Sequence, residues 1–352
     1  MQTPLPAILM SYSDSAFTNP HEAVLPDEPK DCRGDFTHMG AKYWGFESQR
    51  HKATSVLPRE QALAYDHDAH GWLLIGLKER AEVDRLAIST KWYTANQVRA
   101  VSVFLKDDMT GKSTQVLDRA PLAPDSEHEF KIPPTVATEC YVECYYEGGI
   151  SRISLFGTKT AEQPPAYKSL LEGVEISHIS NDHYGNPAMA VSGNRAETHM
   201  RGWESARTGF GERALFHLRK PAVVREIVVD TYLHRLNAPL TSHVFGINGF
   251  EEAHMAAAPR WKIVTQAGKD IIPDDFRSFM LEQKYLPEKN FRIKLHLPEK
   301  SPWQPILPFA ALAPDTFHRF RDLEKHAPVT HVLYMHYPNG GIHGLKVSGT
   351  ES

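Results

Sequence analysis

Gly202-Trp203-Glu204-Ser205-Ala206-Arg207 is a repeated block, because Gly45-Phe46-Glu47-Ser48-Gln49-Arg50 is an earlier copy of it in the same chain. A second block behaves in the same way, since Gly148-Gly149-Ile150 returns as Gly340-Gly341-Ile342. The copies stand in the same order along the chain, so one duplication explains both blocks. We therefore predict two domains that share one fold.

The length and composition of the chain support this division. Its 352 residues exceed one ordinary hydrophobic core and fit two domains of roughly 150–180 residues. Hydrophobic content of 41% and charged content of 23% are typical of a soluble globular protein. We place the boundary after the polar segment 159–165, which ends in two prolines, so that the repeats span 1–165 and 166–352.

Strand-like runs dominate both halves. Short stretches rich in β-branched and aromatic residues recur between turn signals, at 72–77, 83–89, 101–105, 139–146, 153–156, 214–218, 223–230, 243–247, 291–297 and 331–336. This pattern predicts an all-β chain with a β-sandwich or jelly roll in each half. The second half is longer between Phe245 and Phe309. We expect that insertion to be partly helical, at Phe250–Met255 and Phe276–Lys284, and to be a candidate lid or oligomer contact.

Charge and cysteine content exclude several classes of protein. A net charge of -4 and a pI near 6.6 give no electrostatic footprint for nucleic acid or an anionic membrane. No apolar run reaches the roughly 18 residues of a membrane helix, and the first ten residues lack the pattern of a signal peptide. Three cysteines are no disulfide framework, and Cys140 and Cys144 read as buried thiols on a strand. We expect a cytoplasmic protein.

The repeated Glu-x-x-Arg pairs are the first candidate site residues. Glu47 with Arg50 and Glu204 with Arg207 keep the same spacing in both copies. A structural ion pair and a substrate-binding pair are equally good interpretations, because duplication copies both kinds of feature.

A predicted strand end gives the second set. Asp230 closes a strand and is followed by His234 and Asn237. The first copy keeps the asparagine as Asn96 but lacks the aspartate and the histidine. Local turn chemistry is the alternative interpretation, whereas the difference between the copies favours the second one as the site of any chemistry.

Other charged residues near turns are candidates of a different kind. Arg152 follows the first glycine pair, where it could bind a substrate carboxylate in a bidentate fork. Asp125 with His128, and Asp315 with His318, could each form an aspartate–histidine dyad, but the preceding proline favours a helix start capped by the aspartate.

The opening of the second unit supplies the best candidate acid or base, His183, with Asp182 beside it. His67, Asp68 and His70 lie in a polar stretch without a further ligand, so a solvated loop is expected there. We predict no metal and no cofactor.

Taken together, these blocks resemble those of the allantoicase family, whose members consist of two tandem allantoicase repeats. The resemblance runs from about Ser11 to Gly349 and is carried in the second unit by Ser180-Asn181-Asp182-His183-Tyr184, Gly202–Arg207, Asp230-Thr231, Asn237 and Tyr337-Pro338-Asn339-Gly340-Gly341-Ile342. Some family positions differ here: Asn339 replaces the hairpin aspartate, and His343-Gly344 stands where the family has an arginine.

The resemblance implies a fold and an activity. The fold would be two tandem jelly-roll β-sandwiches similar to galactose-binding domains, assembled as a homo-oligomer. The activity would be hydrolysis of a small molecule, allantoate, to ureidoglycolate and urea. In that reading His183, Glu204, Asp230 and His234 are catalytic, and the substrate-binding residues are Asp182, Arg207, Asn237, Arg152, Glu47 and Arg50. Two alternatives stay open: an enzyme of this fold recruited to another reaction, and a jelly-roll pair that binds a small molecule without catalysis.

Overall fold

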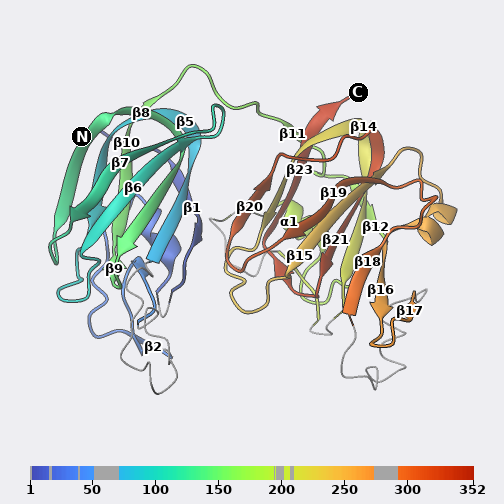
Figure 1. The fold of residues 1–352 in the computed structure, drawn as a ribbon, viewed down its shortest axis with the longest axis horizontal. Coiled ribbons are helices and arrows are strands. Elements are labelled where there is room, and N and C mark those ends of the chain that lie inside the picture. Colours follow the sequence, from blue (N-terminus) through green and yellow to red (C-terminus); the bar gives the residue numbers. More distant parts are fainter. Residues whose placement is uncertain are drawn as a thin grey trace. The chain divides into compact units, whose positions relative to one another are not determined.

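The computed structural model describes residues 2–15, 18–38, 40–50, 71–193, 195, 202–206, 210–272 and 292–352. The chain separates into two compact units, Met1–Pro165 (unit 1) and Ala166–Ser352 (unit 2). Strands make up most of each unit, as Figure 1 shows, which confirms the all-β prediction. No helix in the described ranges is long and apolar enough to cross a membrane.

Unit 1 is organised around two long strands, β5 and β8. Its elements are β1 (Ala7–Tyr12), the 3-10 helix η1 (Pro20–Val24), β2 (Phe36–Thr37), β3 (Gly40–Ala41), β4 (Phe46–Glu47), β5 (Gly71–Ser89), β6 (Ala100–Asp107), β7 (Lys112–Pro121), β8 (Glu127–Tyr145), β9 (Gly149–Ile150) and β10 (Arg152–Lys159). The main sheet runs β1-β5-β8-β6-β7, and β10 also pairs with β5.

The long strands bend, and the bend closes the core of unit 1. The register of β5 against β8 shifts between Gly76 and Ala81, so the first part of β5 pairs with β1 and the last part with β10. Leu73 from the first part and Leu86 from the last part are both fully buried in one hydrophobic cluster. The two parts therefore face each other across a shared core, as the layers of a sandwich do.

Unit 2 repeats this plan, with β14 in the place of β5. Its elements are β11 (Lys168–Ser169), β12 (Glu175–Ser177), α1 (Pro187–Val191), β13 (Trp203–Glu204), β14 (Glu212–Asp230), β15 (Thr241–Ile247), η3 (Glu252–Ala257), β16 (Arg260–Val264), β17 (Asp270–Ile271), β18 (Arg292–His296), β19 (Gln304–Ala311), β20 (Phe317–Phe320), β21 (Val329–Tyr337), β22 (Gly341–Ile342) and β23 (Gly344–Glu351). The main sheet runs β11-β23-β14-β21-β15-β19, with β12 and β20 also on β14.

The described part of the insertion of unit 2 forms a small sheet. β16 pairs with β17 and β18, and their apolar side chains form a separate cluster that includes Trp261 and Trp303. The 3-10 helix η3 overlaps the expected helix at Phe250–Met255. The expected helix at Phe276–Lys284 lies outside the described residues.

The repeated Pro-Asp segments form turns and not helix starts. Asp125 has a φ of +46°, and its Oδ1 accepts a hydrogen bond from the Trp92 N–H at 2.8 Å. His128 lies at the start of β8. Its Nε2 accepts a hydrogen bond from the Ala123 N–H at 2.8 Å, and its Nδ1 lies 3.1 Å from the Ile88 carbonyl oxygen. Unit 2 repeats these contacts, so both pairs tie strand ends together, and the capped-helix prediction is wrong.

Candidate active site

In each unit, the repeated glutamate block and the repeated glycine block lie side by side. In unit 2, β13 pairs with β22, which sets Glu204 opposite Gly341. In unit 1, β4 pairs with β9, which sets Glu47 opposite Gly149. The glutamate that occurs in both repeats therefore lies beside the glycine hairpin of its own unit. The duplication preserved a three-dimensional arrangement as well as a sequence.

A hydrogen-bonded chain starts from Glu204 in unit 2. The Nδ2 of Asn237 donates to Glu204 Oε1 at 2.7 Å, and the Oδ1 of Asn237 lies 3.3 Å from His234 Nδ1. Because that amide oxygen can only accept, the neutral imidazole carries its proton on Nδ1 and presents a lone pair on Nε2. The ring lies against Gly341, where an added Cβ would be 2.1 Å from Nδ1. The hairpin glycine is thus required for the histidine to fit.

Unit 1 has the same frame without the imidazole. Asn96 Nδ2 donates to Glu47 Oε1 at 3.2 Å, and Arg50 donates to the same oxygen at 2.7 Å. Tyr93 occupies the position of His234, with its ring against Gly149 and its hydroxyl bound to the backbone carbonyl of Phe46 at 3.2 Å. Burial raises the pKa of Tyr93 well above its ordinary value. A phenol held in this way exchanges no proton near neutral pH.

The two glutamates also differ in access to solvent. Glu47 is completely buried, and its Oε2 has no hydrogen-bond partner. Glu204 is half-buried, on a two-residue strand at the rim of its unit. Of these two glutamates, Glu204 is therefore the one that is open to a ligand.

The opening of unit 2 lies beside this carboxylate. Tyr184 N–H donates to the backbone carbonyl of Glu204 at 3.0 Å, and Asn181 Oδ1 accepts from the N–H groups of His183 and Ala206 at 3.1 and 3.2 Å. These bonds bring the segment 181–184 against β13. The side chains of Asp182 and His183 are exposed there.

Asp230 belongs to a separate cluster. Its carboxylate binds Arg195 in a bidentate pair, with Nε–Oδ2 at 2.7 Å and Nη2–Oδ1 at 2.8 Å, and is itself buried. Asp230 lies opposite Gly344 in the sheet, three residues along the chain from Gly341, the partner of Glu204. The sequence offered no signal for Arg195, because it lies outside every repeated block.

The remaining predicted site residues are engaged elsewhere or lie outside the described ranges. Arg152 donates to Glu28 Oε1 at 2.9 Å and lies 3.6 Å from Glu127, and its hydrogen bond lowers the pKa of Glu28. Arg207 and the stretch His67–His70 fall outside the described residues. Among the residues that are described, no group of three or more His, Cys, Asp or Glu side chains is arranged to hold a metal ion.

The core of unit 2 contains a buried histidine beside Trp203 of β13. His336 is completely buried, lies opposite Ser242 in the sheet, and has its ring 4.9 Å from the ring of Trp203. Neither ring nitrogen has a hydrogen-bond partner. Burial lowers the pKa of His336 to about 3, with a smaller contribution from His243. The matching position in unit 1 is Cys144, so this polarity is specific to unit 2.

The fold and the site together define a tandem β-sandwich protein with a carboxylate–amide–imidazole chain in its second repeat. A family model described as the allantoicase repeat matches residues 2–160 and again residues 168–352. The chain belongs to the allantoicase family.

Individual relatives extend over most of the chain. It is 23% identical to a probable allantoicase of Schizosaccharomyces pombe, covering 97% of this chain and 89% of that protein. It is 24% identical to the allantoicase of Neurospora crassa, covering 96% of this chain and 87% of that protein. A crystal structure of allantoicase from Saccharomyces cerevisiae aligns with a TM-score of 0.35 and 19% identity, over 99% of this chain and 92% of that one.

Proposed function

We propose that this protein is an allantoicase, which hydrolyses allantoate to ureidoglycolate and urea, and that the reaction takes place around Glu204. Family membership over both halves of the chain supports the activity. The observation that carries the location is the Glu204–Asn237–His234 chain, in which unit 1 keeps the carboxylate and the amide but has the phenol of Tyr93 in place of the imidazole.

The reaction exchanges one bond for another at a single carbon. Allantoate carries a carboxylate and two ureido groups on that carbon. A water oxygen bonds to the carbon, the carbon–nitrogen bond to one ureido group breaks, and the departing nitrogen takes up a proton and leaves as urea. Catalysis therefore requires an acceptor for the proton of water, a donor for the leaving nitrogen, and a cation for the substrate carboxylate.

The described residues supply the first two. Glu204 has one oxygen held by Asn237, so its orientation is fixed while the other oxygen accepts a ureido N–H or the proton of water. His183 is exposed beside β13 and donates the proton to the leaving nitrogen. His234 is buried and acts through Asn237 as a positioning residue.

The cation is proposed from the repeat. Arg207 follows Glu204 by the spacing at which Arg50 follows Glu47, and Arg50 reaches its glutamate at 2.7 Å. Arg207 is proposed to bind the substrate carboxylate, and Asp182, exposed beside β13, is proposed as a further substrate-binding residue. Asp230 and Arg152 are held in ion pairs, so the proposed site is centred on Glu204 and not on them.

The test is release of urea from allantoate by the purified protein, measured with urease. Urea is expected to appear in a one-to-one ratio with ureidoglycolate and to fall to background in Glu204→Gln. An absence of urea at high enzyme concentration would contradict the assignment.

The second part of the proposal concerns the oligomeric state of the protein and its cellular compartment. Leu236 is fully exposed and Leu240 is 61% exposed on unit 2, which supports burial of this surface in a homo-oligomer. All three cysteines lie in the described residues, are buried and form no disulfide, which supports a reducing compartment such as the cytoplasm. Light scattering after size-exclusion chromatography measures the first, and imaging of a fluorescent fusion measures the second.

A further inference from the structure

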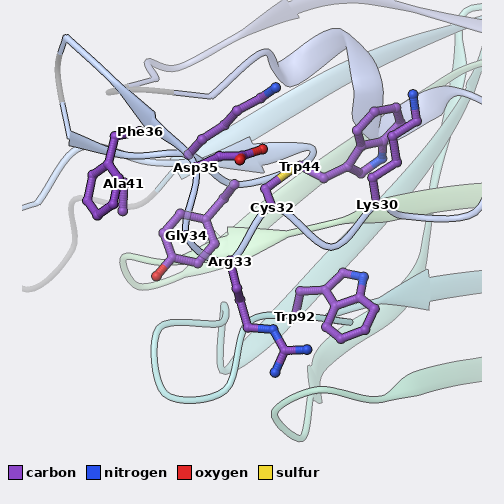
Figure 2. Close-up of a pocket in the computed structure, with 11 residues that line it drawn as sticks. Lys30, Cys32, Arg33, Gly34, Asp35, Phe36, Ala41, Trp44 and Trp92 are labelled. Atoms are coloured by element: carbon purple, nitrogen blue, oxygen red, sulfur yellow. The ribbon is translucent and has the colours of Figure 1, made fainter.

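A cavity of about 170 Å³ lies in unit 1, apart from the Glu204 site. The segment from Lys30 to Trp44 forms most of its lining, and Trp92 closes one side (Figure 2). Trp92 is held in place because its Nε1–H donates to the Pro29 carbonyl at 2.9 Å. The cavity is therefore bounded by a fixed aromatic wall.

One hydrogen-bond donor of a lining residue has no acceptor among the described residues. Trp44 is more than nine-tenths buried, and its Nε1–H has no acceptor. An unsatisfied buried donor is unfavourable, which points to an acceptor supplied by a ligand. The ammonium group of Lys30 lies 4.9 Å from the centre of the same indole ring.

The charges of the lining favour an anion. Neither Lys30 nor Lys42 forms an ion pair among the described residues, whereas Arg33 is already bound by Asp31 at 2.6 Å. Asp35 is the acidic residue of the lining. Two lysines outside ion pairs, one of them over the Trp44 ring, together with one carboxylate fit a ligand that has an acidic group at one end and an N–H donor at the other.

The lining offers binding groups without a reactive one. Cys32 is buried there, and burial raises the pKa of its thiol, so the group stays protonated and unreactive near neutral pH. No histidine lines the cavity in the described residues.

We propose that this cavity binds a small ureido carboxylate without converting it, so that unit 1 senses the same class of molecule that unit 2 hydrolyses. The carboxylate lies between Lys30, Lys42 and the Trp44 N–H, and the ureido N–H groups face Asp35. The identity of the ligand class rests on the proposed function. The cavity and its unused donor are independent of that function.

The experiment is isothermal titration calorimetry with hydantoate (N-carbamoylglycine), a ureido carboxylate with a single ureido group. The full-length Glu204→Gln protein is titrated, so that turnover plays no part. Lys30→Gln/Lys42→Gln is then added to that background, and Lys112→Gln, an exposed lysine on β7, serves as the matched control. A second test variant, Trp44→Phe, removes the N–H and keeps an aromatic ring.

Binding to Glu204→Gln that is weakened about tenfold or more by the double lysine variant, and unchanged by the control, supports the proposal. Hydantoate that binds with equal affinity with and without the two lysines overturns it, as does an absence of binding to Glu204→Gln. The proposed function fails by a different result, which is the absence of urea release from allantoate by the unmutated protein.

Discussion

Replacing Asn237 with alanine tests the centre of the proposed site. The substitution removes the 2.7 Å hydrogen bond to Glu204 and the 3.3 Å contact with His234. A hydrogen bond to a charged group contributes about 1.5–3 kcal/mol, and because Glu204 is only half-buried, water replaces part of it in the variant. If the bond is needed in the transition state, kcat/KM falls by up to about 150-fold, and about tenfold is the expected size.

Asn96→Ala in unit 1 is the matched control. It removes the equivalent bond, at 3.2 Å, to Glu47. Both variants are expected to lose similar stability in guanidinium melts, and only Asn237→Ala is expected to lose urea release, measured where both proteins remain folded. An equal loss of activity in the two variants, or full activity in Asn237→Ala, would refute the placement of catalysis in unit 2.

Three further substitutions test neighbouring features. His234→Tyr installs the residue that unit 1 carries as Tyr93, so the fold should persist by circular dichroism while kcat falls with little change in KM; full kcat would show that the imidazole is not needed. Asp230→Asn breaks the buried pair with Arg195 and should destabilise the protein by about 3–5 kcal/mol in guanidinium melts, and a change near zero would contradict a structural role for the pair. His336 is neutral when folded, with a pKa of about 3 against 6.5 in the unfolded chain, so its stabilising contribution is complete above about pH 6.5 and declines by about 1.4 kcal/mol per pH unit as the pH falls towards 3. His336→Cys should therefore flatten the acid side of the stability curve, and an unaltered curve would exclude this origin.

The repeat made the frame of the site predictable. Glu204 and Asn237 recur as Glu47 and Asn96, and in each unit the amide binds the carboxylate. The strands were also predictable from the sequence. Runs rich in β-branched residues and bounded by turn residues indicate strands in either layer of a sandwich. The sequence did not predict that one long strand bends to take part in both layers. A register shift between paired strands does not change the spacing of apolar residues along the chain.

Residues outside the repeated blocks could not be assigned. Arg195 reaches Asp230, and Trp44 lines the unit 1 cavity, through contacts that join segments without a shared pattern. The partner of Arg152 was equally hidden, because Glu28 lies in an irregular segment far away in the sequence. Local chemistry also misled: a proline before Asp125 suits a helix start, but the aspartate has a left-handed backbone in a turn.

A duplicated protein needs each copy to fold, and the contacts common to both copies are those that fold it. The glutamate, the asparagine and the hairpin glycine are shared, so their presence alone does not indicate catalysis. What differs is the group that covers the glycine and the access to the carboxylate. Unit 1 has Tyr93, with a raised pKa, above a fully buried Glu47, whereas unit 2 has His234 behind a half-buried Glu204. Of the two repeated glutamates, only Glu204 is open to a ligand, and only Glu204 has an imidazole, His234, behind the asparagine that orients it.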